Sequence, residues 1–329
     1  MIKNYMTEST MSHADFSETR PDLSVVIVSW NTQSLLRDCL ASLFESNVHA
    51  KLEVFVVDNH SRDGSSEMVE TCFPSVRLIR NDHNAGFAKA NNQALKLAKG
   101  RHVLLLNSDT LVHSGVIDAS IDYMDLHPEV GMMGCRVLNG DGTVQKTCSQ
   151  FPTLTNLFLL TTGLFRVPGL DFAQRYRMDN WQRDDERDVE VVSGCYLVVR
   201  SDAMSTVGLL DEDFFFFGEE TDWCRRFLAH GYAVRFAPVG TITHFGGGSS
   251  KSLSSKRDLM LSEATVRLHR KHGGLVPAAA AWTILLVFNA SRFTYWSLQD
   301  LLQSSSQSRK MHFRGVVTGF LTAWPKVRQ

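Results

Sequence analysis

The sequence lacks the short motifs that identify several common classes of enzyme. It contains no G-x-x-x-x-G-K-[ST] segment, which argues against a P-loop NTPase. It has no G-x-G-x-x-G segment after its first apolar run, which argues against a nicotinamide enzyme, and it lacks the G-x-S-x-G segment of the α/β hydrolases. The chemistry of this chain must therefore depend on another arrangement of residues.

Cysteine is scarce and poorly placed for metal binding. The six cysteines are widely separated, with no C-x-x-C pair and no His-rich neighbour at zinc spacing. This pattern favours reduced thiols in the core of a cytosolic protein. Residues 1–21 are polar and lack the apolar run of a secretory signal, so we expect them to form a flexible leader.

Long apolar runs are also rare. Residues 151–165 are uncharged but too short to span a bilayer as one helix. Residues 275–290 also carry no charge, yet as a helix they would cover roughly 24 Å of a hydrocarbon core that is roughly 30 Å thick. The residues around this segment suit a headgroup boundary: Arg270, Lys271, Arg292, Tyr295 and Trp296. The pattern favours an interfacial or partly inserted helix, with a buried helix of the soluble core as the alternative.

Charge is distributed unevenly along the chain. The formal net charge is −1, but residues 267–329 contain nine Lys or Arg and a single acid, Asp300. The C-terminal region therefore carries +8, which predicts contact with an anionic surface. Because no nucleic-acid motif accompanies these charges, we expect lipid headgroups rather than nucleic acid, with a solvated basic tail as the alternative.

Short β-branched runs alternate with helical patterns from Leu23 onward. Strands are predicted over 23–29, 52–58, 76–80 and 102–107, and the last is apolar throughout, as expected for a central strand. Further strands are predicted at 189–200 and 232–238, the latter followed by a Gly-rich loop. The pattern predicts an α/β fold with a mostly parallel sheet flanked by helices.

Polar residues follow four of the predicted strands. They are Trp30-Asn31, Asp58-Asn59, the loop 84–92 and Asn107-Ser108-Asp109. Open α/β sheets bind ligands at the carboxyl ends of their strands, so these groups are candidates for one site. Asp109 can bind Mg²⁺ or Mn²⁺ together with a diphosphate, and His244 can complete the coordination of a Mn²⁺-like ion. Ordinary turns and helix caps are the alternative.

An acidic cluster follows a run of four phenylalanines. Glu219, Glu220 and Asp222 lie at the start of a helix predicted to reach His230. Acids are favoured in a first helical turn by the helix dipole alone. The functional alternative is that the apolar residues 214–217 raise the pKa of one carboxyl group, which then acts as a general base.

These blocks together resemble the family 2 glycosyltransferases of GT-A fold, specifically the bacterial rhamnosyltransferase-like branch that builds cell-surface polysaccharides. The resemblance covers residues 23–250. It is carried by the ordered segments VVIVSWN, VVDNHSRDGS, NAGFAKANN, LLLNSDT, SGCYLVVR, FFFFGEETDWCRR and THFGGGS. It implies a glycosyltransferase domain at 22–250 and a basic helical C-terminal extension at 251–329, which is a candidate for membrane association.

The resemblance also implies roles for individual residues. Asp109 and His244 would bind Mg²⁺ or Mn²⁺, because Asn107-Ser108-Asp109 occupies the D-x-D position of the family with Asn in place of the first acid. Glu220 would be the general base, one methylene longer than the usual Asp, with Glu219 and Asp222 orienting or binding the acceptor. The donor-binding residues would be Asn31, Asp58, Asn84, Gly86, Phe87, Asn91, Asn107 and Ser108.

The implied reaction is an inverting transfer from a nucleoside-diphospho-sugar, with dTDP-L-rhamnose as the first choice. The acceptor would be a hydroxyl of a glycan or a polyprenyl-linked sugar at the cytoplasmic face of the bacterial inner membrane. Two alternatives stay open. A sugar nucleotidyltransferase would normally carry a Gly-rich basic loop after its first strand, where this chain reads SWNTQS. A non-catalytic nucleotide-sugar-binding protein is the other.

Overall fold

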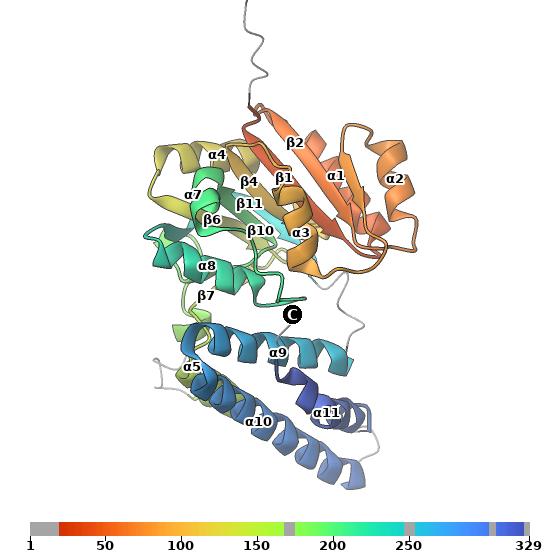
Figure 1. Cartoon of the computed structure of the whole chain (residues 1–329), viewed down its shortest axis with the longest axis vertical. Helices are drawn as coiled ribbons and strands as arrows, with labels where there is room; N and C mark the ends of the chain where they lie inside the picture. The colour runs from red at the N-terminus through yellow and green to blue at the C-terminus, as the bar shows by residue number, and fades with distance from the viewer. Residues whose placement is uncertain (1–19, 168–174, 247–253, 303–306, 326–329) are drawn as a thin grey trace, which may run out of the picture.

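The computed structural model describes residues 20–167, 175–246, 254–302 and 307–325. All but the last two residues of the predicted leader lie outside this part of the chain. An α/β unit and a layer of C-terminal helices lie next to each other (Figure 1).

A single large sheet forms the centre of the α/β unit. Within the described residues its strand order is β3-β2-β1-β4-β10-β6-β11-β5, and β8 pairs with β11. The pairs β2–β3, β1–β2, β1–β4 and β6–β11 are parallel, whereas β10, β5 and β8 run antiparallel to their neighbours. The predicted mostly parallel α/β sheet is confirmed. Its strands are β1 (Leu23–Ser29), β2 (Leu52–Asp58), β3 (Arg77–Arg80), β4 (His102–Asn107), β5 (Thr110–Val112), β6 (Val130–Leu138), β8 (Arg187–Asp188), β10 (Tyr196–Arg200) and β11 (Ala233–His244).

Helices cover both faces of this sheet. One face packs against α1 (Gln33–Glu45), α2 (Ser65–Cys72) and α4 (Val116–Leu126). The other packs against α3 (Phe87–Leu95), α7 (Ser201–Val207) and α8 (Glu219–Ala229). Strand β4 shows why its sequence is continuously apolar: Leu104 and Leu106 enter the first core, whereas Val103 and Leu105 enter the second. Each such buried side chain contributes roughly 1.5–3 kcal/mol.

The register of the central strands brings their carboxyl ends to one level. Ser29 at the end of β1 pairs with Asp58 at the end of β2, and Val28 pairs with Asn107 at the end of β4. The residues that follow β1, β2 and β4 therefore leave the sheet along the same edge.

Two predicted segments differ from the structure. The strand predicted over 189–200 is two strands, β9 (Val191–Val192) and β10, because the chain passes at residues 193–195 from a small sheet with β7 (Cys148–Ser149) into the main sheet. The segment predicted as a strand and a loop near 232–249 is one twelve-residue strand, β11, up to His244. Its register with β6 shifts between Phe236 and Thr241, where Pro238 and Gly240 suit an irregular strand.

The C-terminal extension consists of α9 (Ser254–Gly273), α10 (Leu275–Leu302) and α11 (Gln307–Gly319). Helix α10 packs on α9, α11 and α5 (Leu154–Thr162). It has 28 residues, longer than the predicted 275–290, because no proline or glycine interrupts the following residues. In the described part of the chain it is the one helix long and apolar enough to cross a membrane by length and composition. Only 17% of its most apolar window is buried, which contradicts the alternative of a core helix.

Candidate active site

A cavity of about 960 Å³ lies between the carboxyl edge of the sheet and the C-terminal extension. Its walls come from segments far apart in the sequence: the ends of β1, β2 and β4, the residues 193–195, the residues 215–220, the end of β11, and helices α9 and α11. The predicted strand-end residues and the predicted acidic residues therefore meet in one place.

Asn59 organises the end of the cavity nearest β2. Its Nδ2 donates to Asn84 Oδ1 at 2.9 Å, and its Oδ1 accepts from the backbone N–H of Ala85 at 2.9 Å. These bonds fix the loop that leads to Gly86 and Phe87. Asn84, Gly86 and Phe87 line the cavity, together with Trp30 and Asn59. This wall offers amide and aromatic groups that suit a nucleoside.

Gly86 is required where this loop meets the phenylalanine run. Its φ is +86°, and a Cβ atom there would lie 2.6 Å from the backbone oxygen of Phe215. The next residue, Phe87, donates its backbone N–H to that same oxygen at 2.7 Å. The loop before α3 and the loop before α8 are thus joined directly.

Three predicted donor residues lie outside the cavity lining. Asn31 is exposed at φ +52°, and its Oδ1 accepts from the backbone N–H of Arg62 at 2.8 Å. Asn91 is buried and donates to Phe87 O at 2.9 Å. Asp58 is buried, and its Oδ2 accepts from the backbone N–H of Ser61 at 3.2 Å. Their side chains hydrogen-bond to the surrounding loops, and their predicted contacts with a donor stay predictions.

Asp109 and His244 are brought together by neighbouring strands. The antiparallel pairing of β5 with β11 places His244 opposite Thr110, the residue after Asp109. His244 Nε2 lies 3.1 Å from Asp109 Oδ1 and 3.4 Å from Asn107 Nδ2. Ser108 also lines the cavity, and its hydroxyl bonds with that of Thr32 at 3.0 Å. The predicted triplet and the predicted histidine therefore share one corner.

Gln145 sets the orientation of the His244 ring. Its Nε2 donates to Asn139 Oδ1 at 2.8 Å and to the backbone oxygen of His244 at 3.2 Å. Its Oε1 is therefore the atom that lies 2.7 Å from His244 Nδ1, which must carry the proton. Nε2 is left facing Asp109, as in histidine ligands whose second nitrogen is fixed by a hydrogen bond.

The corner fits a divalent ion that is bound together with a diphosphate. One carboxylate and one imidazole suit Mn²⁺, and Mg²⁺ also accepts the carboxylate. Within the described ranges no cluster of three or more His, Cys, Asp or Glu side chains forms a metal-binding group. Asp109 and His244 would thus supply two ligands and leave the other positions to phosphate oxygens and water.

Glu219 and Glu220 begin α8 beside the cavity, directly after Gly218. Burial raises the pKa of both carboxyl groups, and it raises that of Glu219 furthest because the charge of Glu220 adds to the effect. Glu219 is therefore the member of the pair that holds a proton more readily and can share it with Glu220, which also accepts from the backbone N–H of Gly194. Glu220 Oε2 is buried without a hydrogen-bond partner. Glu220 lines the cavity, so its carboxylate can accept a proton from a group bound there.

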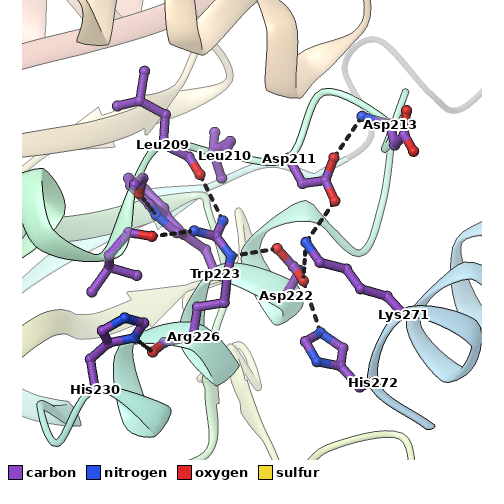
Figure 2. A network of polar contacts seen from close by, with 12 residues as sticks. Leu209, Leu210, Asp211, Asp213, Asp222, Trp223, Arg226, His230, Lys271 and His272 are labelled. Atoms are coloured by element: carbon purple, nitrogen blue, oxygen red, sulfur yellow. Dashed lines mark hydrogen bonds and ion pairs between the residues drawn. The ribbon is translucent and has the colours of Figure 1, made fainter. Parts of the chain in front are cut away.

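Asp222, predicted to orient or bind the acceptor, does not line the cavity, and that role stays a prediction. Its carboxylate is fully buried between α8 and α9 (Figure 2). Oδ1 accepts from His272 Nε2 and Lys271 Nζ, both at 2.8 Å, and Oδ2 accepts from Arg226 Nε at 2.9 Å. The side chain of Asp222 thus joins the helix that carries Glu220 to the C-terminal extension.

Several residues that complete the site carry no recognisable sequence pattern. Gln145 follows a turn and carries no motif, although it orients His244. The extension contributes Arg257, Asp258 and Met260 from α9 and His312 from α11. Spacing does not reveal these residues, because they approach the cavity only through tertiary packing.

Comparison with known proteins agrees with this geometry. The family model described as glycosyl transferase family 2 matches residues 24–203, more than half of the chain. This chain belongs to that family. The matched segment includes the strand ends that carry Asn59 and Asn107–Asp109, and the predicted resemblance to family 2 is confirmed.

Relatives of this glycosyltransferase include two named enzymes of lipid-linked sugars. It is 26% identical over 279 residues to an N-acetylglucosaminyl-diphospho-decaprenol L-rhamnosyltransferase of Mycobacterium tuberculosis, covering 80% of this chain and 89% of the relative. It is 25% identical over 145 residues to a UDP-Glc:alpha-D-GlcNAc-diphosphoundecaprenol beta-1,3-glucosyltransferase of Escherichia coli, covering 43% of this chain and 56% of the relative. The rhamnosyltransferase-like character is confirmed.

A solved structure supports the fold of the glycosyltransferase. A mannosyltransferase from Pyrobaculum calidifontis, in complex with GDP-Man and Mn²⁺, matches with a TM-score of 0.53 at 16% identity. The match covers 92% of this chain and 86% of the mannosyltransferase. The predicted GT-A fold is confirmed.

We expect Gln145→Leu to weaken Mn²⁺ binding by the glycosyltransferase about 10- to 100-fold, because His244 loses the hydrogen bond that orients its ring. Titration calorimetry with Mn²⁺ in the presence of a nucleoside diphosphate measures this. Asp109→Ala should bind Mn²⁺ even less. Gln33→Leu, which removes an amide outside the cavity, is the matched control. An unchanged affinity in Gln145→Leu would show that Gln145 does not orient a metal ligand.

We expect Asp222→Asn to lower the free energy of unfolding by about 3 kcal/mol, because Arg226 and Lys271 lose a buried counter-charge and His272 loses its charged hydrogen-bond partner. Burial acts to raise the pKa of Asp222, but the hydrogen bonds from His272 and Lys271, with the charge of Arg226, bring it down to about 2. Its ionised form therefore stabilises the fold above the ordinary pKa of 3.8, and this stabilisation is lost as the pH falls towards 2.

Urea unfolding at several pH values measures this effect. The difference between the wild type and Asp222→Asn should shrink as the pH falls from 5 towards 2, since the wild-type carboxylate becomes protonated. Asp202→Asn makes the same change at an exposed position and should alter the free energy by about 0.5 kcal/mol or less. A difference that does not vary with pH would contradict the assigned role of the Asp222 charge.

Proposed function

We propose that this glycosyltransferase moves a sugar from a nucleoside diphosphate to a hydroxyl of a polyprenyl-diphosphate-linked acceptor, with inversion and with a divalent metal. L-Rhamnose from dTDP-rhamnose is the first choice of donor, because the relative from Mycobacterium tuberculosis is named as an L-rhamnosyltransferase. The observation that carries the proposal is the placement of Asp109, His244 and Glu220 in the wall of one cavity.

The two ends of the donor fit different parts of the cavity. The nucleoside would lie against Trp30, Asn59 and Asn84, where amide groups are already held by hydrogen bonds. The diphosphate would lie at Asn107–Asp109 and His244. The metal bound there would neutralise charge that develops on the leaving diphosphate. A mannosyltransferase of the same fold is named as a complex with Mn²⁺ and a nucleotide sugar, which supports this assignment.

The proton transfer falls to Glu220. The acceptor hydroxyl gives its proton to Glu220 Oε2 as its oxygen bonds to the anomeric carbon, and the bond from that carbon to the diphosphate breaks. A single displacement of this kind inverts the anomeric configuration. Glu219, protonated and hydrogen-bonded to Glu220, holds the base in place without adding a second negative charge. Positioning of the reactants supplies much of the remaining acceleration.

The alternative activities fit the cavity less well. A sugar nucleotidyltransferase needs cationic groups that bind the triphosphate of its substrate. The end of β1 instead carries the hydroxyl groups of Ser29 and Thr32, which bond with each other and with Ser108 after β4. A non-catalytic binding protein has no use for a buried carboxylate with a free oxygen beside the sugar. A panel of nucleotide sugars with and without Mn²⁺ or Mg²⁺, read as nucleoside-diphosphate release, decides among the three.

The extension would hold the enzyme on the cytoplasmic face of the bacterial inner membrane. Helix α10 packs against α9 and α11 along one side, where Ala278 and Ala281 are buried. Its other side exposes large apolar residues, among them Leu298 and Leu301 at 59% and 82%. A helix held in this way cannot be surrounded by lipid, so interfacial binding fits better than a span.

We expect Glu220→Gln to reduce turnover by roughly 10²- to 10⁴-fold, because the general base is lost while the shape of the side chain is kept. Glu70→Gln, at an exposed position of α2, is the control and should leave turnover unchanged. Nucleoside-diphosphate release with donor and acceptor measures both. Turnover near the wild-type rate in Glu220→Gln would remove this residue from the mechanism.

The pH dependence of kcat/KM gives the same role a second test. Since burial raises the pKa of Glu220, activity should fall with decreasing pH through a value above the ordinary pKa of 4.5. The residual activity of Glu220→Gln should lack this acid limb.

We expect the double variant Leu298→Glu/Leu301→Glu to bind anionic liposomes at least about tenfold more weakly than the wild type, because two apolar side chains no longer leave water on binding. Sedimentation with vesicles of phosphatidylglycerol measures binding. Leu126→Glu changes an equally exposed leucine on α4 and is the control. Equal sedimentation of all three proteins would show that this side of α10 does not contact the membrane.

A further inference from the structure

The wall of the cavity that faces the sheet edge comes from the C-terminal extension. Arg257, Asp258 and Met260 of α9 and His312 of α11 line it. Figure 1 shows α9 across from the sheet, with the loop before α8 between them. The proposed roles at the metal, the nucleoside and the base use none of these side chains.

Arg257 is the cation of this cavity that has no carboxylate partner among the described residues. Lys146 is paired with Asp179 at 2.5 Å, and His312 Nε2 lies 3.1 Å from Asp258 Oδ2. The guanidinium of Arg257 instead lies over the ring of Phe217, 5.5 Å from its centroid. A positive charge without a counter-ion in a cavity favours an anionic ligand.

The ring beneath Arg257 belongs to Phe217, whose backbone is strained and whose neighbours hold the ring in place. Phe217 has a φ of +71°, which is rare for a bulky residue and is maintained only by its surroundings. Its ring packs on Phe216, with centroids 4.3 Å apart, and against the cluster of Phe214, Ala264 and Leu268. An aromatic face fixed in this way restricts the planar guanidinium, which then needs little further ordering to bind an anion.

We propose that Arg257, with His312 beside it, binds the diphosphate of the lipid-linked acceptor. The guanidinium can hold two phosphate oxygens at once through parallel N–H groups. This inference rests on the proposed function, because it takes the acceptor to be a polyprenyl-diphosphate-linked sugar.

The position of Arg257 favours the acceptor over the donor. The diphosphate of the donor is assigned to the corner of Asp109 and His244, on the sheet edge. Arg257 lies on α9, and α9 packs directly on α10, the helix proposed to face the membrane. An acceptor sugar at Glu220 would thus be followed by its diphosphate at Arg257 and by its prenyl chain towards α10. The order of chemical groups matches the order of the structural elements.

Steady-state kinetics with two acceptors tests the proposal. One is N-acetylglucosaminyl diphosphate carrying a farnesyl chain, and the other is a neutral N-acetylglucosaminyl alkyl glycoside of similar length. We expect Arg257→Ala to raise the KM of the diphosphate acceptor about 10- to 100-fold, while the KM of the donor and that of the neutral acceptor stay within about twofold. Lys256→Ala removes the same charge from the neighbouring exposed residue and is the control.

A binding measurement keeps the proposal independent of activity. Farnesyl diphosphate is titrated into the full-length protein in EDTA, so that a metal at Asp109 and His244 does not contribute. Arg257→Ala should weaken binding at least tenfold and His312→Ala severalfold, whereas Lys256→Ala should not. A wild type that releases no nucleoside diphosphate from any nucleotide sugar would reject the proposed function, and the titration would still test this site. Unchanged binding in Arg257→Ala, or a raised KM of the donor, would overturn the inference.

Discussion

The buried charge of Asp222 holds the two halves of this protein in their working arrangement. Its carboxylate takes one hydrogen bond from Arg226 on its own helix and two from Lys271 and His272 at the end of α9. Arg226 in turn donates to the backbone oxygens of Val207 and Leu209, which ties α7 and the following loop to the same network (Figure 2). An ionised carboxylate can be buried here only because three hydrogen-bonding partners meet it, two of them the cations Arg226 and Lys271. If α9 moved, that charge would lose two of them.

The position of this network explains why it matters for the site. Asp222 is two residues beyond Glu220 in the first turns of α8. The same helix therefore directs Glu220 to the cavity and Asp222 to the extension. As a result, Glu220 and the cavity wall formed by α9 are fixed relative to each other. The carboxyl groups on the two sides of α8 also differ in the direction of their pKa shifts. Asp222 keeps a pKa of about 2 because hydrogen bonds from His272 and Lys271 and the charge of Arg226 outweigh its burial, whereas burial raises the pKa values of Glu219 and Glu220.

The sequence predicted the sheet half of the site better than the helical half, for physical reasons. Strand β4 is apolar throughout because both of its faces are buried, and this local pattern also located Asn107 and Asp109 at its end. Parallel strands then bring separate strand ends to one edge without further information. The contact of Gln145 with His244, by contrast, could not be predicted, because these residues are 99 positions apart and meet only through tertiary packing. The partners of Asp222 could not be predicted for a related reason: an acid in a first helical turn has the same sequence pattern whichever way its side chain points.

The two halves also differ in what they can recognise. The sheet edge offers backbone geometry, amides and a corner for a metal, which suit the nucleoside and diphosphate that all donors of this kind share. The extension offers Arg257, His312 and an exposed apolar helix, which suit the charge and the lipid of one class of acceptor. Selection of the acceptor can therefore change through α9 and α11 without disturbing the donor corner, provided that Asp222 still finds its partners. Lys271 and His272, which hold the extension to Asp222, and Arg257, which is proposed to bind the acceptor, lie on the same helix α9, about four turns apart. These two requirements are therefore met by separate ends of one helix.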